Sequence, residues 1–162
     1  MSLTDWSGFF SAEVSAAASL TGLVIVAISI NLSQILAHPH LPGRAIETLS
    51  MLVGVLLVAS VGLVPGQPVA ALGCEILAIG VAMWLTTTVL LVQARGLPVP
   101  GKTWAPVLRI LLAQLATLPF VIAGVVVLLR GPLGLYWLVP GTVFCLIAAV
   151  LNAWVLLVEI VR

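Results

Sequence analysis

The segment that decides the fold runs from Pro65 to Ala94, with the sequence PGQPVAALGCEILAIGVAMWLTTTVLLVQA. It opens with two prolines and a glycine, which are residue types that end helices. In the residues 69–94 that follow, Glu75 is the one charged side chain. An apolar run longer than about 20 residues can cross about 30 Å of hydrocarbon as a helix. We therefore expect residues 69–94 to span a membrane and to form an antiparallel hairpin with the apolar run before Pro65.

The composition extends this expectation to the whole chain. Of the 162 residues, 62% are hydrophobic and 7% are charged, whereas about 25% of the residues in an average soluble domain are charged. Most of such a surface must face lipid, so the lipid bilayer is the expected partner and no soluble domain is expected. The formal net charge of +1 offers no basic surface for nucleic acid.

Turns that contain proline and glycine divide the chain into five apolar runs. The sequence thus predicts an all-α integral membrane protein, a compact bundle of about five transmembrane helices that forms one domain over residues 1–162. The helices are expected at about residues 5–36, 44–64, 69–94, 103–130 and 135–162.

The basic residues predict the orientation of the bundle. With five crossings, Arg130 lies on one side of the membrane. The other basic residues share the opposite side: Arg44, Arg95, Lys102, Arg109 and Arg162. Because basic residues in short loops are retained in the cytoplasm, we expect the N-terminus outside and the C-terminus in the cytoplasm. The short loops and this charge bias are typical of small proteins of the bacterial cytoplasmic (inner) membrane.

A stripe of small, mostly polar residues follows the first helix. Serines recur at every fourth position, and at 100° per residue the stripe stays within about 120° of the helix surface. We call these residues the serine face: Ser7, Ser11, Ser15, Ser19, Gly22 and Ser29. Small residues at this spacing allow close helix contact, which predicts a helix–helix seam. Alternatively, the hydroxyls of several copies would line a polar pore.

Two glutamates are expected at a similar depth near the outer surface. Glu13 lies in the first helix and Glu75 in the third, while Arg130 ends the fourth. Charged groups inside a membrane require a partner, and Arg130 is the basic side chain expected to compensate one of them. The pair of acids is interpreted either as a mouth that attracts cations or protons, or as side chains that reach the outer headgroups.

A second charged group is expected near the inner surface. It consists of Arg44, Glu47, Arg109 and Glu159, from the second, fourth and fifth helices. Ion pairs among them would lower the insertion cost of Arg109 and fix the packing of the helices; the alternative is a gate made of breakable ion pairs. Pro119 is expected to kink the fourth helix, which is a weak indication of gating.

The sequence contains no phosphate-binding glycine loop, nucleophile elbow or HExxH motif, so no enzyme, catalytic residue or cofactor is predicted. His38 and His40 alone make a poor metal site, and none is predicted. Cys74 and Cys145 are interpreted as small buried hydrophobic residues.

Two functions remain as hypotheses. The first is a small homo-oligomeric membrane channel, because one chain with so little polar interior can scarcely enclose a hydrated route, whereas a ring of copies could line one with the serine face. The second is a non-transporting accessory or regulatory subunit that docks on another membrane protein. A lipid or another apolar ligand held between helices is compatible with the composition as well.

Overall fold

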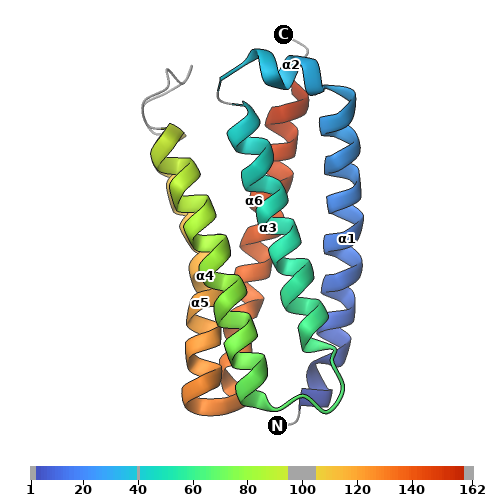
Figure 1. Ribbon diagram of the computed structural model, residues 1–162, viewed down its shortest axis with the longest axis vertical. Coiled ribbons are helices and arrows are strands. Elements are labelled where there is room, and N and C mark those ends of the chain that lie inside the picture. The colour runs from blue at the N-terminus through green and yellow to red at the C-terminus, as the bar shows by residue number, and fades with distance from the viewer. Residues whose placement is uncertain (1–2, 40, 95–104, 159–162) are drawn as a thin grey trace.

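The structure, a computed structural model, describes residues 3–39, 41–94 and 105–158 (Figure 1). These residues are almost entirely helical and contain no strand. The elements in chain order are η1 (Leu3–Trp6), α1 (Ser7–Ile30), α2 (Leu32–Ala37), α3 (Leu41–Gly62), α4 (Val69–Ala94), α5 (Ala105–Arg130), η2 (Gly131–Trp137) and α6 (Leu138–Val158).

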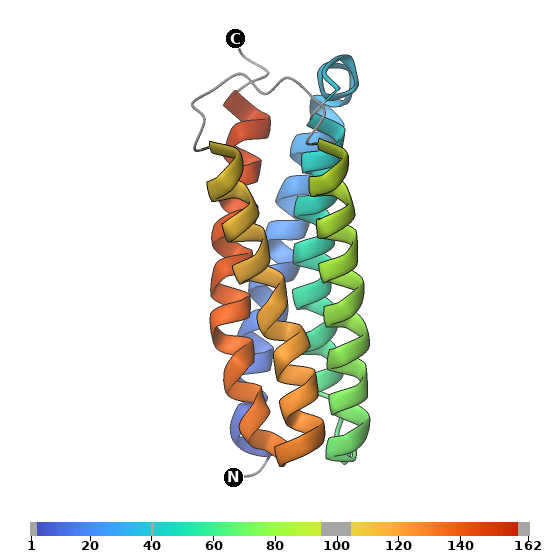
Figure 2. The same cartoon turned by 90° about the vertical axis from the view of Figure 1, so that its left-hand side faces the viewer.

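The five long helices lie lengthwise in one bundle (Figures 1 and 2). α1 begins at the end drawn at the bottom of Figure 1, here called the lower end, and α6 finishes at the opposite, upper end. α3 packs against α1, α4 and α6, whereas α5 packs against α4 and α6. α1 contacts α3 and α6 and so forms one edge of the bundle, with α4 and α5 on the other side of α3 (Figure 1).

Four stretches of the described chain are long and apolar enough to cross a membrane. Three are single helices, and the fourth runs 48 residues from Val107 to Trp154 through α5, η2 and α6. The chain turns between these two helices at Gly131, whose φ of +70° is a conformation that glycine adopts without strain. The all-helical architecture follows the sequence prediction, and η2 divides the fourth stretch into the last two expected helices.

The ends of α1 and α3 differ from the sequence expectation at the upper end of the bundle. The helix expected over residues 5–36 is interrupted at Asn31, whose side-chain amide donates to the Ala27 carbonyl at 3.0 Å. α2 then crosses the upper end of the bundle (Figure 1). α3 begins at Leu41, before the expected residue 44, because Pro42 is tolerated in a first turn that needs no N–H donor.

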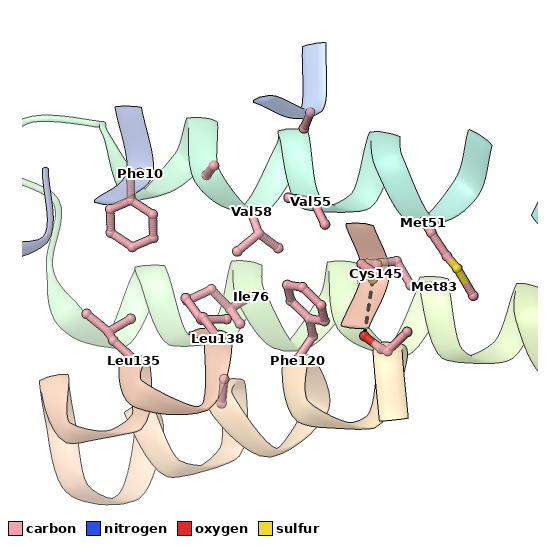
Figure 3. Packing of buried hydrophobic residues seen from close by; sticks show 14 of the residues in the cluster. Phe10, Met51, Val55, Val58, Ile76, Met83, Phe120, Leu135, Leu138 and Cys145 are labelled. Atoms are coloured by element: carbon pink, nitrogen blue, oxygen red, sulfur yellow. Dashed lines mark hydrogen bonds between the residues drawn. The ribbon is translucent and has the colours of Figure 1, made fainter. Parts of the chain in front are cut away.

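The interior of the bundle is filled by large apolar side chains from all five long helices. Phe10, Met51, Ile76, Phe120 and Leu138 are each at most 1% exposed, and Figure 3 shows them stacked between the helices. Polar side chains are buried as well, but most of them are threonines whose hydroxyls bond to their own helix. The described core is therefore packed, and it holds no continuous hydrated route along the bundle axis.

Glycines bring α4 and α5 into close contact. A Cβ atom added at Gly80 would lie 2.9 Å from the Phe120 backbone, and one added at Gly124 would lie 2.6 Å from the Leu77 backbone. Both distances are too short for real carbon atoms, so the helices approach at these points only because the side chains are absent. Close packing at small residues is the usual means of helix association in membranes.

Candidate functional site

An ion pair joins α3 and α5 near the upper end of the bundle. Arg109 Nη2 donates to Glu47 Oε2 across 62 positions of sequence. The Glu47 side chain is 1% exposed and that of Arg109 is 19% exposed. A carboxylate this deeply buried is stable only when paired, so the contact fixes the position of α5 against α3.

The expected inner cluster is thus partly assembled in the described residues. Glu47 and Arg109 are paired, and Arg44 lines a cavity beside them. Glu159 lies outside the described residues, so its expected place in the cluster stays a prediction.

A cavity of about 180 Å³ lies beside the ion pair, between α3, α5 and α6. It has a polar side formed by two arginines, Glu47 and an amide, and an apolar side formed by aliphatic residues. The lining residues are Arg44, Glu47, Met51, Leu108, Arg109, Leu112, Ala113, Ala148, Leu151 and Asn152. We call it the arginine cavity.

A second cavity lies on the other side of Arg109. Its volume is about 270 Å³, and its lining residues are Pro39, Gly43, Ile46, Leu90, Gln93, Ala94 and Arg109. Arg109 borders both cavities, so the upper end is hollow on either side of the Arg109–Glu47 pair. Arg109 Nε is buried and has no hydrogen-bond partner in the described part of the chain. A buried donor that lacks an acceptor costs about 1–3 kcal/mol.

The serine face lies on the outside of the bundle. All six of its residues are exposed, whereas α1 packs through Phe10, Ala17, Thr21 and Val24. The Ser15 hydroxyl donates to the Ser11 carbonyl at 3.0 Å, and the Ser29 hydroxyl donates to the Ile25 carbonyl at 2.7 Å. Any seam that uses this face must therefore form with another chain.

The most exposed positions of α1 from Ser7 to Gly22 are all small residues. From Ser7 to Gly22, each exposed position is Ser, Gly or Ala; these positions are Ser7, Gly8, Ser11, Ala12, Ser15, Ala18, Ser19 and Gly22. Beyond Gly22 the exposed residues become large, with Leu23 at 68% and Val26 at 56% exposed.

The lower half of α4 carries a second small exposed stripe. From Ala70 to Ala82 its exposed positions are Ala70, Cys74, Ala78 and Ala82, which recur at every fourth residue. The expectation that Cys74 is buried is wrong, because the thiol belongs to this outer stripe, whereas Cys145 is buried as expected. We call these four residues the alanine face; it lies on the opposite side of α3 from α1 (Figure 1).

The two outer glutamates are not brought together. Glu13 is half-buried and its carboxyl interacts with Thr142 of α6, while its Oε2 atom has no hydrogen-bond partner in the described residues. Glu75 accepts a hydrogen bond from Gln67 in the turn before α4. Arg130 is exposed at the end of α5 and, within the described residues, pairs with neither glutamate.

Two polar contacts inside the bundle were not predicted from the sequence. Trp84 Nε1 donates to Gln114 Oε1 at 2.8 Å between α4 and α5. The Cys145 thiol donates to the Ala116 carbonyl at 3.2 Å, in the turn that precedes Pro119 (Figure 3). A proline inside a helix has no N–H, so a carbonyl oxygen in the preceding turn loses its usual donor. Pro119 was therefore a signal in the sequence for a donor on a neighbouring helix. α5 continues through Pro119, and the kink stays a prediction.

The chain was compared with family models, with curated proteins and with solved structures, and no match was found in any of the three.

Proposed function

We propose that this chain is the subunit of a homo-oligomeric channel of the bacterial cytoplasmic membrane. Each subunit crosses the membrane five times, with the lower end outside and the upper end in the cytoplasm, and the polar path is lined by the serine face of α1. The observation that carries the proposal is the row of Ser, Gly and Ala at every exposed position of α1 from Ser7 to Gly22.

The packed interior supports a path between subunits. Phe10, Phe120 and Leu138 occupy the centre of the single bundle, so a hydrated route cannot run through it without repacking. α1 lies at an edge of the bundle, where its hydroxyls are available to neighbouring copies. A path lined by this helix therefore requires several copies around it.

The alanine face supports a closed ring. A ring needs two different surfaces on each subunit that fit one another, because a head-to-tail contact must repeat around the axis. The serine face up to Gly22 and the alanine face both consist of small residues, and the helices that carry them, α1 and α4, lie on different sides of α3 (Figure 1). Contact between them would place the serine hydroxyls along the boundary between copies.

The hydroxyl geometry favours cations as the permeating species. Ser15 and Ser29 donate their protons to carbonyls of their own helix, so each oxygen presents acceptor lone pairs outward. Oxygen acceptors of this kind replace part of the hydration shell of a cation.

The second candidate is the accessory subunit that docks on a different membrane protein. The same hydroxyl bonds favour it, because a serine whose donor is already satisfied needs no water and can lie in a dry seam. The two candidates differ in the identity of the neighbour. The first requires a second copy, and the second requires another protein.

Cysteine cross-linking tests the proposal through the native Cys74. Ser11→Cys on the serine face should form disulfides with Cys74 of adjacent copies in membranes and give a ladder of multimers after oxidation. Ser60→Cys is the matched control, since Ser60 is also exposed and bonded to its own helix but lies on α3. Cys74→Ser in the Ser11→Cys background should abolish the ladder.

Flux measurements complete the test. Ser15→Leu should abolish cation flux into proteoliposomes, while Ser60→Leu should leave it unchanged. Native mass spectrometry should give one stoichiometry of about four copies or more, as a ring requires. A monomer without a cross-linked ladder would refute the ring and favour the accessory subunit. A ring without flux would refute the channel alone.

A further inference from the structure

We propose that the arginine cavity binds the phosphate group of an anionic phospholipid from the cytoplasmic leaflet. The proposal rests on the described lining of the cavity and, for the cytoplasmic leaflet, on the orientation given in the proposed function. It does not depend on the channel or on ring formation. The side chains that would hold the phosphate are Arg109, Arg44 and Asn152.

The donors of Arg109 are only partly used within the chain. Its Nη2 group is bound to Glu47, whereas its buried Nε has no acceptor in the described residues. Guanidinium groups bind phosphate oxygens through their rigid fork of N–H donors. Arg109 lines the cavity, so its remaining N–H groups can donate to a phosphate oxygen there while the bond to Glu47 is kept.

The other lining groups suit a singly charged anion. Asn152 contributes an amide that can donate, and Arg44 adds a second guanidinium group to the lining. Glu47 also lines the cavity, and its carboxylate repels anions, most strongly those with two charges. A phosphodiester carries one negative charge, so it fits this lining better than a dianionic phosphate does.

The position of the cavity matches the depth of lipid headgroups. Arg109 lies four residues after the first residue of α5, which is about 6 Å along a helix that rises 1.5 Å per residue. Leu108 and Leu151 line the same cavity and are 45% and 49% exposed. The cavity is therefore bordered by apolar surface of the kind that acyl chains cover, and basic pockets between transmembrane helices on the cytoplasmic side suit anionic headgroups.

Lipid titration of the delipidated, detergent-solubilised protein tests the proposal. Phosphatidylglycerol and diacylglycerol, which lacks the phosphate, are added separately with identical acyl chains, and bound lipid is counted by native mass spectrometry. We expect phosphatidylglycerol to bind at least about tenfold more tightly, because hydrogen bonds to charged groups contribute this much or more. Arg44→Gln and Asn152→Leu should each remove most of this preference, and circular dichroism checks that both variants keep their helices.

Arg130→Gln is the matched control. It removes one positive charge from the lower end of the same bundle, far from the cavity, and should leave the lipid preference unchanged. Equal binding of the two lipids would overturn the proposal. A preference that survives in both cavity variants, or that Arg130→Gln removes equally, would also overturn it. Inorganic phosphate is added as a separate ligand, and its binding without any preference between the lipids would assign the cavity to a free anion and refute the lipid.

Discussion

Removing the positive member of the buried ion pair should destabilise the bundle strongly. Arg109→Met leaves the Glu47 carboxylate 1% exposed and without its partner. Breaking a buried pair in this way costs about 3–5 kcal/mol. Because Arg109 itself is 19% exposed and borders two cavities that can admit water, we expect the lower part of that range, about 3 kcal/mol. This corresponds to about a hundredfold lower ratio of folded to unfolded protein.

The double variant Glu47→Leu/Arg109→Met should recover most of this loss. Two apolar side chains of similar volume leave no charge behind, and such replacements are often neutral or stabilising. Unfolding by sodium dodecyl sulfate in mixed micelles, followed by circular dichroism, measures each free energy of unfolding. Arg130→Met is the exposed control and should stay within about 0.5 kcal/mol of the parent. A loss below about 1 kcal/mol for Arg109→Met, or a double variant as unstable as the single one, would refute the reasoning.

Two further predictions concern the contact between α4 and α5. Gly124→Ala should destabilise the bundle by about 1–3 kcal/mol in the same unfolding assay, since its Cβ would lie 2.6 Å from the Leu77 backbone; Gly43→Ala, which has nothing within 4 Å, should not destabilise it. Trp84→Phe should cost about 0.5–1.5 kcal/mol because the Gln114 carbonyl oxygen loses its donor, and a loss that persists in the Gln114→Leu background would contradict this assignment.

The helices and their turns could be predicted because proline and glycine end a helix through local backbone effects. Pro65, Gly66 and Pro68 end one helix and begin the next whatever surrounds them, so α4 matches the expected residues 69–94. The interruption at Asn31 could not be read in the same way. Asparagine is only a weak breaker, and its amide bond to Ala27 is one of several local options for this side chain.

The ion pair could be predicted as a class of contact but not as a specific pair. Charges in a membrane require partners, so Arg109 had to meet a carboxylate, and Glu47 and Glu159 were the candidates. The choice depends on how α3 and α5 lie against one another, and residues 62 positions apart carry no local signal for it. The cavities beside the pair depend on the same packing.

The side of each helix that faces the bundle interior could not be predicted from hydrophobicity. In water, an apolar stripe identifies the buried face of a helix, but in lipid the buried and the exposed faces are both apolar. Glu13 illustrates the difficulty, because the sequence left its side chain either at an outer mouth or at the headgroups, and gave no sign of its interaction with Thr142 of α6. Periodicity grouped the serines correctly on one face, but it could not decide whether that face met another helix of this chain.

The size of the exposed residues distinguishes a surface that faces lipid from one that faces another helix, which hydrophobicity does not. The exposed apolar residues in the lower halves of α5 and α6 are large, such as Ile122 and Val143. Lipid tails pack well against large side chains, so a surface that faces lipid does not require small residues. Close contact between helices does require them. The serine face up to Gly22 and the alanine face both depart from this rule. Within the described residues neither face packs against another helix, so cross-linking at Cys74 is the direct test of the proposed contact between chains.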